Sequence, residues 1–304
     1  MKRSSSWKKI GRLLEIEGHK PWAASHSAVP FAEHIAGDAY RIYFTTRDDH
    51  NRSHTGYVVL ELSRPTEILE LCQKPVLAPG PLGAFDDSGA MGSWLTSVGD
   101  KSYLYYQGWN LGVTVPFRNS IGVAIREKNG VFQRIFEGPI LDRTANEPHF
   151  TATPCVVQDD GRWDMWYLSC VGWELDGGKP KHRYHIKHAV SVNGLDWARN
   201  GDISIDFKDS SEYAISRPSV MKCGSLWRMW YSFRGDRYRI GYAESEDGSN
   251  WERMDDRAGI DVSHTGWDSE MVEYPFVFRH DDATYMLYNG NDYGRSGFGL
   301  AVLE

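Results

Sequence analysis

The chain has 304 residues and a formal net charge of −7, and 13% of its residues are aromatic, with 12 Trp and 30 Gly. The negative charge argues against a surface that binds nucleic acid or an anionic membrane. The many aromatic residues and glycines, without a long helical pattern, favour an all-β protein with numerous turns. No apolar run approaches the length of a membrane span, and none follows the basic start of the chain, so we expect a cytoplasmic protein.

A short aromatic and aliphatic run that ends in polar residues occurs five times along the chain. The copies occupy residues 40–48, 102–110, 163–169, 226–234 and 284–291. A strand-like segment precedes each copy, another follows it, and in most copies a fourth lies near Ile68, Phe132, Trp197 or Trp251. A repeat with a period of tens of residues indicates one supersecondary unit used several times.

The two ends of the chain complement each other. The fifth copy reaches Glu304 without a fourth strand, whereas residues 7–10 (Trp-Lys-Lys-Ile) resemble residues 197–200 and 251–254 of the other fourth strands. An N-terminal strand that completes the last sheet would close a ring and remove exposed sheet edges. We therefore predict an all-β, five-bladed β-propeller in one domain, residues 1–304. The alternative, two stacked β-sandwich domains, does not explain why the ends match.

The predicted blades are approximately residues 22–72, 85–141, 149–206, 214–260, and 270–304 together with 5–16. Connections between strands two and three, and between blades, are long and polar, whereas the other turns are short. In an up-and-down sheet these long connections share one face. Variable polar loops on a rigid scaffold mark a functional face, so we expect the site there, over the central channel.

Acidic residues stand at or just before the first strand of four predicted blades. They are Asp86, Asp87, Glu147, Glu212, Asp268, Glu270 and Glu273, and the first blade supplies His26 instead. One such acid is more often a turn cap, but the repetition favours a functional set, because like charges around a channel repel. Glycosidic cleavage needs a protonated acid and a second group that activates water or attacks. We expect Glu273 to be the acid and Asp87 or Glu147 to be the base or nucleophile.

Aromatic, basic and polar side chains of the same face are candidates for substrate binding. Trp109 and Trp173 could stack on sugar rings, although propeller sheets also need packed aromatics. Arg217 begins an innermost strand, so we expect it to face an acid, Glu212 or Glu273, or an anionic ligand. Arginines without an acid partner would indicate a phosphate or carboxylate on the substrate. The binding candidates are His26, Arg47, Asp48, Arg52, Trp109, Asn110, Arg118, His149, Trp173, Glu212, Arg217, Arg234, Glu270, Tyr274 and Asn291.

Histidines and cysteines give no metal signature. His185 and His188 point to opposite faces of a predicted strand, with His182 nearby, so we predict neither a metal nor another cofactor. The spacing of the cysteines matches no metal site, and without an export signal we expect free thiols. These cysteines are Cys72, Cys155, Cys170 and Cys223.

The repeats and their motifs resemble the five-bladed propeller glycosidase superfamily, which includes arabinanase- and xylosidase-type enzymes, invertases and mannoside phosphorylases. The resemblance covers all five repeats and is strongest at residues 85–89 (Phe-Asp-Asp-Ser-Gly), 216–220 (Ser-Arg-Pro-Ser-Val) and 285–291. At residues 110–119 and 266–275 the chain is similar to an uncharacterised bacterial group of such propellers associated with surface-polysaccharide gene sets.

The chain departs from this superfamily at the residues that carry its chemistry. Arabinanase-type enzymes place an acid beside the first-strand proline in three consecutive blades, where this chain has residues 28–29, 91–92 and 152–153, none of them acidic. The Asn-Asp-Pro and Arg-Asp-Pro signatures of invertases are missing as well. Fold alone does not determine function, so the resemblance does not supply the reaction.

Together these features lead us to expect a glycoside hydrolase-like, carbohydrate-active enzyme that cleaves or transfers a glycosyl group. The substrate would be a small molecule or oligosaccharide, with an anionic or phosphorylated sugar favoured by the arginines. One alternative is a glycoside phosphorylase, in which arginines hold phosphate and a single protein acid suffices. Another is a non-catalytic glycan-binding propeller in polysaccharide biosynthesis. Neither nucleic acid nor a membrane is an expected partner.

Overall fold

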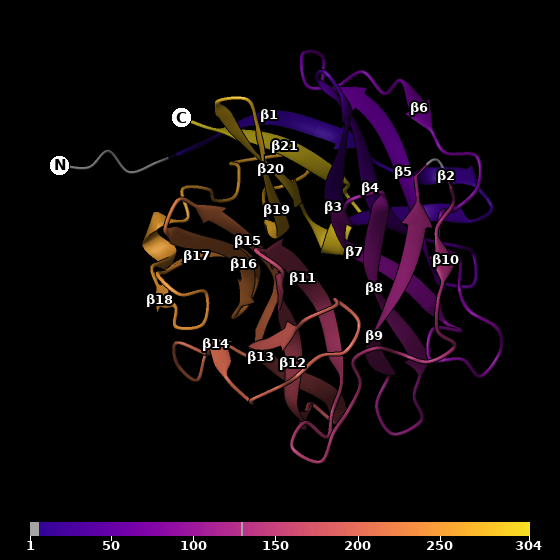
Figure 1. Cartoon of the computed structure of the whole chain (residues 1–304), viewed down its shortest axis with the longest axis vertical. Coiled ribbons are helices and arrows are strands. Elements are labelled where there is room, and N and C mark those ends of the chain that lie inside the picture. Colours follow the sequence, from indigo (N-terminus) through magenta and orange to yellow (C-terminus); the bar gives the residue numbers. More distant parts are fainter. Residues whose placement is uncertain (1–5, 129) are drawn as a thin grey trace.

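The computed structural model describes residues 6–128 and 130–304, and its regular structure is almost entirely β-strand (Figure 1). This confirms the predicted all-β class. The prediction that the chain lacks an export signal concerns in part residues 1–5, which lie outside the described residues. In the described ranges no helix has the length and hydropathy of a membrane span.

Hydrogen bonds join the strands into three sheets, and each of the two larger sheets contains one short parallel pairing, Ser53 with Gly89 and Tyr184 with Ala214. Divided at these two pairings, the strands form five antiparallel groups in chain order. The first group is β2 (Glu17–Lys20), β3 (Ala23–Ala36), β4 (Ala39–Arg47), β5 (Ser53–Glu61) and β6 (Glu70–Leu71). The second is β7 (Gly89–Val98), β8 (Lys101–Leu111), β9 (Phe117–Glu127) and β10 (Gln133–Arg134). The third is β11 (Thr151–Asp159), β12 (Arg162–Asp176), β13 (Lys179–Ser191) and β14 (Ile203–Ile205).

The fourth group is β15 (Ala214–Cys223), β16 (Leu226–Arg234), β17 (Tyr238–Ser245) and β18 (Glu252–Arg253). The fifth is β19 (Glu273–His280), β20 (Ala283–Asn289), β21 (Phe298–Leu303) and the N-terminal β1 (Trp7–Leu14). Two short 3-10 helices, η1 (Asp255–Arg257) and η2 (Asp292–Gly294), lie in connections.

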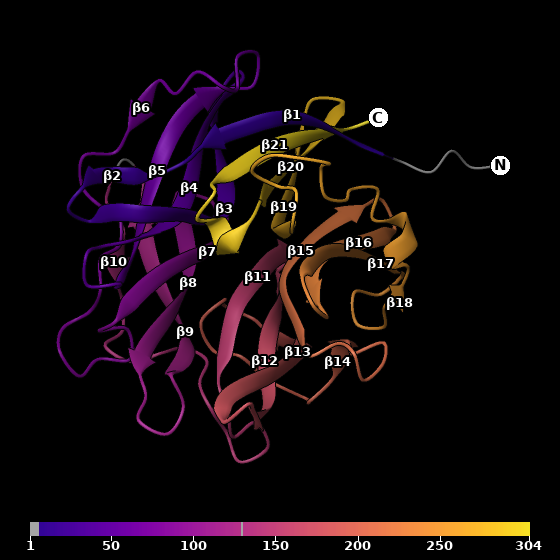
Figure 2. The ribbon, with the colours of Figure 1, turned by 180° about the vertical axis from the view of Figure 1, so that it is seen from behind.

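One strand of each group lies towards the middle of the molecule, and we call β3, β7, β11, β15 and β19 the inner strands (Figures 1 and 2). Each inner strand contacts the next in chain order, and β19 contacts β3. The groups therefore follow one another around a common centre.

The N-terminal strand β1 pairs with the C-terminal strand β21, as the similarity of the chain ends predicts. Trp7 lies opposite Leu303, and Leu14 lies opposite Phe298. The sheet order is β1-β21-β20-β19, so β1 takes the outer place that β10, β14 and β18 take in their own groups. Figure 2 shows β1 lying along β21.

Four of the five inner strands are interrupted at a residue that precedes proline. Val29, Thr153, Arg217 and Tyr274 have φ angles of 54°, 40°, 52° and 55°. The pairing with the second strand shifts register across each of them. A residue before proline is normally extended, and a positive φ is unfavourable for a residue with a Cβ. The surrounding structure must therefore hold each interruption in place.

At most of these interruptions, a side chain of a neighbouring strand group accepts a hydrogen bond from the backbone N–H. The pairs are Asn289 Oδ1 with Val29 (2.8 Å), Thr55 Oγ1 with Gly92 (2.7 Å), Thr153 Oγ1 with Arg217 (3.2 Å), and Ser232 Oγ with Tyr274 (2.7 Å). Between the second and third groups, the Ser93 hydroxyl instead donates to the Pro154 carbonyl at 3.1 Å. These bonds join each group to the next at the level of the interruptions, the fifth to the first included.

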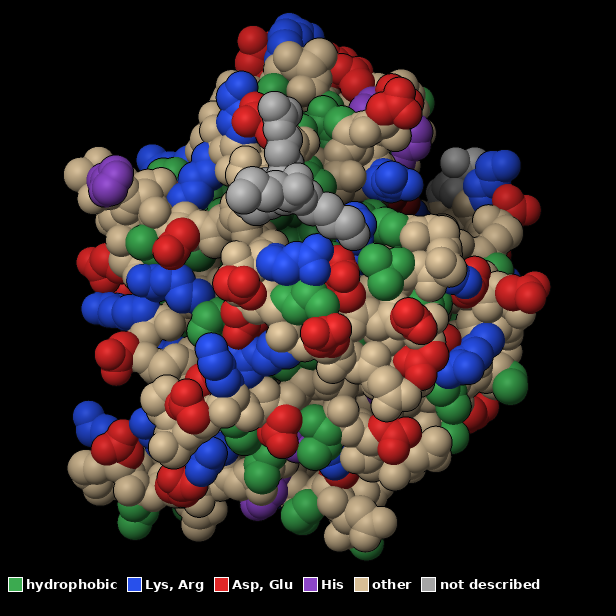
Figure 3. Space-filling model, turned by 90° about the vertical axis from the view of Figure 1, so that its left-hand side faces the viewer, with side chains coloured by type: hydrophobic (Ala, Val, Ile, Leu, Met, Phe, Trp, Pro, Cys, Tyr) green, Lys and Arg blue, Asp and Glu red, His purple; other side chains and the backbone are tan. Residues whose placement is uncertain are grey.

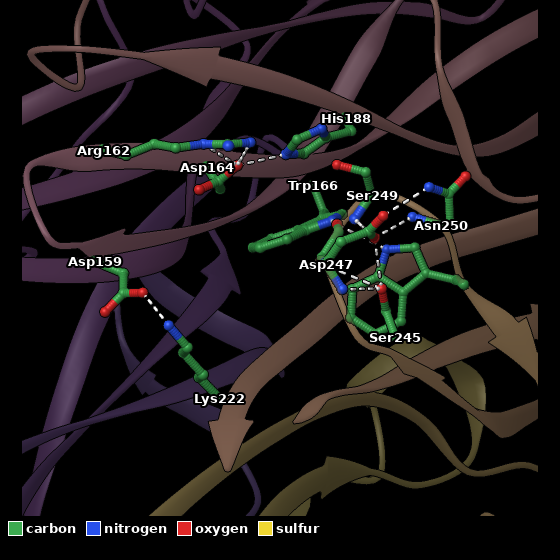
Figure 4. Close-up of polar contacts among 12 residues, drawn as sticks. Asp159, Arg162, Asp164, Trp166, His188, Lys222, Ser245, Asp247, Ser249 and Asn250 are labelled. Carbon is green, nitrogen blue, oxygen red and sulfur yellow. Dashed lines mark hydrogen bonds and ion pairs between the residues drawn. The ribbon is translucent and has the colours of Figure 1, made fainter. Parts of the chain in front are cut away.

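Further bonds join the groups at the tight turns between third and fourth strands. The Trp166 indole donates to the Gly248 carbonyl at 2.9 Å, in a turn that Asp247 organises (Figure 4). The N–H groups of Asn250 and Ser249 donate to Asp247 Oδ1, both at 2.8 Å, and the first of these is the main cause of the lowered pKa of Asp247. The same figure shows Lys222 of β15 paired with Asp159 of the third group.

Four groups contain an acid, buried in three of them and half-buried at Asp255, that binds a tyrosine of the second strand and a cation on or beside the fourth strand. These acid–tyrosine–cation clusters are Asp86, Tyr106 and Arg134; Glu147, Tyr167 and Arg199; Asp255, Tyr231 and Arg253; and Asp268, Tyr288 and Lys9. Lys9 belongs to β1, so the N-terminal strand supplies the cation that other fourth strands supply in their groups. Buried charges need such partners, because an unpaired one costs several kcal/mol.

The surface is mixed in charge. On the side of the molecule shown in Figure 3, acidic and basic side chains alternate, and hydrophobic side chains occur in small patches.

All four cysteines are free thiols, as expected, and three of them are buried.

Replacing Lys9 with methionine tests the joint between the chain ends. The Lys9 Nζ lies 2.6 Å from Asp268, whose side chain is 3% exposed. Lys9→Met leaves that carboxylate buried without its cation, and we expect the free energy of unfolding to fall by ~3 kcal/mol in chemical denaturation.

Lys8→Met is the matched control, because Lys8 pairs at 3.2 Å with Glu304 where both side chains are more than half exposed. We expect it to change the unfolding free energy by less than ~0.5 kcal/mol. Equal losses for the two variants would contradict the role assigned to Lys9.

Candidate functional site

A cavity of about 510 Å³ lies where all five strand groups meet. Inner strands contribute residues at and beside their interruptions, such as Ala28, Thr153 and Tyr274, and second strands contribute residues near their ends, such as Arg47 and Arg234. The connections between second and third strands add further residues, including Asn51, Pro116 and Tyr293. The cavity therefore opens on the face that carries these long connections.

Two guanidinium groups give the cavity its charge. In the described part of the chain, no Asp or Glu is among the lining residues. Arg47 donates to Asn51 Oδ1 at 2.7 Å, and its burial lowers its pKa. The Arg234 guanidinium lies 5.4 Å from the ring centres of Tyr238 and Tyr293, and its buried Nε has no hydrogen-bond partner among the described residues. Both groups are placed to receive an anion.

Two histidines in the lining are neutral near pH 7. Burial, and then the charge of Arg47, lower the pKa of His26 to about 4. Burial, and then Arg234, lower the pKa of His182 to about 4. His26 Nδ1 lies 2.9 Å from the Ser25 hydroxyl, and the His182 ring stacks on Tyr184 with centres 4.7 Å apart. These rings can exchange hydrogen bonds with a ligand but do not add positive charge at neutral pH.

Glu273, the first residue of β19, is fully buried beside the cavity. No hydrogen bond of normal geometry reaches either carboxylate oxygen within the described residues. Burial raises the pKa of Glu273 well above its usual value, and Arg234, the Tyr274 side chain and the Tyr293 backbone only partly oppose this. Desolvation is the largest of these effects, so the site favours the protonated form of the carboxyl group.

Tyrosines separate Glu273 from the cavity. Tyr184, Tyr238, Tyr274 and Tyr293 all line the cavity, whereas Glu273 does not. The hydroxyl groups of Tyr184 and Tyr238 are 2.5 Å apart. Tyr238 is the first residue of β17, and Tyr184 lies within β13. Neither residue was among the site residues expected from the sequence.

An aromatic wall closes the side of the cavity formed by the second and third groups. Phe117 and Phe150 line the cavity, with ring centres 5.5 Å apart. Trp173 lies behind them, 5.4 Å from Phe117 and 5.7 Å from Phe150. Trp173 therefore supports the wall, and Trp109 is the tryptophan that lines the cavity.

Arg217 has neither of the acid partners that the sequence suggested. Glu212 pairs with Arg253 at 2.7 Å, and the ion pairs within the described residues include none for Arg217. The Arg217 guanidinium is fully buried, donates to the Pro30 carbonyl at 3.1 Å, and lies 5.7 Å from the Trp94 ring. Burial lowers its pKa to about 9. Because Arg217 follows Ser216 of the lining and contacts other inner strands, it fills the centre beneath the cavity.

The two expected partners of Glu273 lie outside the lining. Glu147 belongs to an acid–tyrosine–cation cluster, with Arg199 at 3.0 Å and Lys187 at 3.3 Å. Asp87 accepts hydrogen bonds from the Gly83 N–H and from Asn110, and so caps its turn. Both acids therefore bind residues of their own groups. These contacts agree with a structural role, as a turn cap for Asp87 and as a packed charge for Glu147.

Of the expected binding residues, His26, Arg47, Trp109, Arg234 and Tyr274 line the cavity. The others do not, and several have partners elsewhere: Asp48 binds Arg52 and His54, Glu270 pairs with Arg237, and Asn291 accepts the Glu270 N–H. Those without a place in the lining are Asp48, Arg52, Asn110, Arg118, His149, Trp173, Glu212, Arg217, Glu270 and Asn291. Within the described ranges, no group of three or more His, Cys, Asp or Glu is placed to hold a metal ion.

Two proteins of known sequence are similar to the whole chain. They are uncharacterized proteins from two strains of Mycobacterium tuberculosis, each 43% identical over 299 residues, which is 98% of this chain and 99% of each relative. No protein-family model matches the chain.

Solved structures of glycosidases share the fold. A glycosyl hydrolase from Bacteroides ovatus superposes with a TM-score of 0.73 at 13% identity, covering 98% of this chain and 93% of that one. A structure from the GH130 family of mannoside phosphorylases and glycoside hydrolases gives 0.69 at 13% identity, covering 99% and 94%. A thermostable family-43 glycoside hydrolase gives 0.64 at 17% identity, covering 94% and 90%. At such identities the likeness shows a shared fold alone.

Glu273→Gln tests the protonation of the buried carboxyl group. Between the usual pKa of about 4.5 and the raised pKa of the folded state, the folded protein holds a proton that the unfolded chain releases. Wild-type stability must therefore fall as the pH rises through this window, and glutamine removes the effect. We compare the unfolding free energy of Glu273→Gln with that of the wild type at each pH. As the pH rises above the usual pKa of a glutamate, the variant should gain up to ~1.4 kcal/mol per pH unit relative to the wild type.

Glu270→Gln is the control in the same thermal or urea unfolding series, because Glu270 is more than half exposed and pairs only with Arg237 in the contacts described. Its difference from the wild type should stay flat with pH. A flat difference for Glu273→Gln as well would mean that Glu273 is ionised in the folded protein.

Proposed function

The chain belongs to one family with the two Mycobacterium tuberculosis proteins and has the fold of the propeller glycosidases, and we propose from this that it is a carbohydrate-active enzyme. It cleaves or transfers a glycosyl group of an anionic sugar. The observation that carries this proposal is the cavity, which is lined by Arg47 and Arg234 and has the buried acid Glu273 beside Arg234. Neither arginine has an ion pair with an acid within the described residues.

The proposal includes a single five-bladed propeller domain over residues 1–304. Its support is the cyclic contact of the inner strands and the place of β1 beside β21. In this arrangement the five groups are the blades and the cavity lies at one end of their common axis. Pockets at such an end are typical binding sites on rigid β scaffolds.

Glu273 is proposed as the general acid. A neutral carboxyl group in a desolvated site can protonate the oxygen of the leaving sugar as the glycosidic bond breaks. Arg47 and Arg234 would hold a carboxylate or phosphate on the substrate, since guanidinium groups bind both in a bidentate manner. The aromatic wall around Phe117 would pack on the apolar face of a sugar ring or aglycone.

Phosphorolysis is the second candidate, and the composition of the cavity favours it over hydrolysis. Hydrolysis of either stereochemistry uses two carboxylates, whereas the lining residues described include none. The acids beside the lining include Glu273 and the exposed Asp292, whose charge acts on His26 and on Glu273. In phosphorolysis, inorganic phosphate held by Arg47 and Arg234 attacks the anomeric carbon, and one protein acid protonates the leaving oxygen. Asp87 and Glu147 would then have no direct part in the reaction.

A panel of nitrophenyl glycosides tests the proposal. Neutral, carboxylate-bearing and phosphorylated sugars would be supplied with and without inorganic phosphate, and released nitrophenol and sugar phosphate would be measured. Turnover that requires phosphate supports phosphorolysis, and turnover without phosphate supports hydrolysis. Calorimetric binding without any turnover would support the non-catalytic glycan-binding alternative and contradict an enzyme.

Glu273→Gln is expected to lower kcat by ~10²–10⁴-fold, because it removes the proton that the leaving oxygen receives. The control is Asp282→Asn, an exposed acid in the turn between β19 and β20, which should leave kcat unchanged. Wild-type kcat in Glu273→Gln would remove Glu273 from the mechanism.

Arg47→Gln and Arg234→Gln are each expected to raise KM for an anionic glycoside, or for phosphate, by roughly 10–100-fold, as loss of one charge-assisted hydrogen bond predicts. The neutral glycoside with the same leaving group is the control substrate, and its KM should change little. An equal rise in KM for both substrates would show that the arginines shape the cavity without recognising charge.

A further inference from the structure

The aromatic wall of the cavity lies between two hairpins, β8–β9 and β12–β13, and it continues towards their tips. Phe117 of β9 and Trp173 of β12 contact each other, with ring centres 5.4 Å apart. Leu111 lies directly opposite Phe117 in the first hairpin, and Leu175 comes two residues after Trp173 in the second. Side chains that are opposite each other, or two residues apart, share one face of a sheet. The two leucines therefore extend the face that forms the wall.

Both leucines are open to solvent. Leu111 is 74% exposed although it lines the cavity, and Leu175 is 77% exposed. A single exposed leucine needs no explanation, because much of any protein surface is apolar. These two, however, continue a packed apolar surface that begins inside the cavity. We call Phe117, Trp173, Leu111 and Leu175 the apolar strip.

The hairpin β12–β13 separates apolar from charged side chains along its outer part. Trp173 pairs with His182. Leu175 pairs with Pro180 two residues further out, so both pairs lie on one face. Charged residues occupy the other face, where the ion pairs are Asp176 with Lys181 at 3.2 Å and Glu174 with Arg183 at 3.3 Å. The charges of that face thus have partners, whereas the apolar face leaves Leu175 uncovered.

The strip adjoins the positively charged part of the cavity. The Arg234 guanidinium lies 5.3 Å from the ring centre of Tyr213, and the Tyr213 ring lies 6.4 Å from that of His182. His182 in turn contacts Trp173, with ring centres 5.5 Å apart. A ligand held at Arg234 can therefore reach the strip. Such a ligand would be anionic at its inner end and apolar at its outer end.

We propose that the substrate is an anionic glycolipid whose alkyl chain leaves the cavity along the apolar strip. This rests on the proposed function, which places an anionic group of the substrate at Arg47 and Arg234. The strip begins inside the cavity, at Leu111 and Phe117, so a second protein docked on it would cover the entrance that the substrate uses. A chain joined to the substrate itself occupies the strip without that conflict.

The chain should add affinity in proportion to its length. Complete burial of one methylene group strengthens binding about fourfold, and half of that free energy, as on an open strip, corresponds to about twofold. Octyl phosphate is six methylene groups longer than ethyl phosphate, so we expect it to bind ~30–100-fold more tightly.

Isothermal titration calorimetry on the full chain tests the path of the alkyl chain. The probes are ethyl and octyl phosphate, and methyl and octyl glucuronide, which carry a carboxylate instead; all are used as monomers in solution. We expect the octyl probe to bind more tightly than the short one in at least one series.

The double variant Leu111→Gln/Leu175→Gln changes only exposed parts of the strip. It should weaken binding of the octyl probe ~10-fold and leave binding of the short probe unchanged, because only the chain loses apolar contacts. The control is Val192→Gln, at a side chain that is 86% exposed in the turn after β13 and outside the cavity lining. It should leave the affinity of both probes unchanged.

The outcomes separate the glycolipid from the proposed function. Equal affinity for short and octyl probes in both series would overturn the alkyl chain and leave the anion site standing. An octyl gain that persists in the double variant would overturn the strip as its path. Binding to phosphatidylglycerol vesicles, without an octyl gain in solution, would mean that the hairpins meet a membrane surface and would overturn the inference. If no probe binds, the inference fails, and turnover of the nitrophenyl glycosides decides separately whether the proposed function stands.

Discussion

The backbone hydrogen bonds at the interrupted inner strands are the interaction on which the rest of the structure depends. Positive φ at residues such as Val29 and Tyr274 is unfavourable next to proline, and it frees an N–H group from the sheet ladder. A side chain from the neighbouring group, such as Asn289 or Ser232, accepts that N–H. The same bonds therefore hold the strained residues and join one group to the next. Three of the four strained residues, Val29, Thr153 and Tyr274, line the cavity. The contacts that join the groups therefore also form part of the cavity floor.

The acids that recur before the inner strands have mainly structural roles. For Asp86, Glu147 and Asp268 the repetition reflects repeated packing, in which a tyrosine and a cation of the same group bind the acid. Lys9 of the N-terminal strand supplies the cation for Asp268. The paired cations offset repulsion among these three acids. Asp87 instead caps its turn, and Glu270 pairs with Arg237 of the fourth group. Glu273 differs from the rest: its carboxylate oxygens have no hydrogen-bond partner among the described residues, and burial raises its pKa well above the usual value.

This contrast gives the cavity its chemical character. Two guanidinium groups, two neutral histidines, several tyrosines and an aromatic wall surround a space that adjoins one neutral acid. The charge of this lining suits an anionic ligand, and no Asp or Glu is among the lining residues that the structure describes. Arg217 closes the centre beneath the cavity, where its guanidinium bonds to the Pro30 carbonyl. Ligands therefore exchange through the loop face.

The sequence by itself determined the all-β class, the five repeats and the pairing of the chain ends, because strand periodicity and the match of residues 7–10 to other fourth strands are local patterns. It also identified the face of the site and cavity residues such as His26, Arg47 and Arg234. Only the tertiary structure decided which acids are enclosed and which one is not, since that depends on partners distant in sequence, such as Lys9 for Asp268. The tyrosine cover of Glu273 was likewise beyond the sequence, because Tyr184, Tyr238 and Tyr274 come together from three strand groups, and burial, which sets a pKa, exists only once the groups are packed.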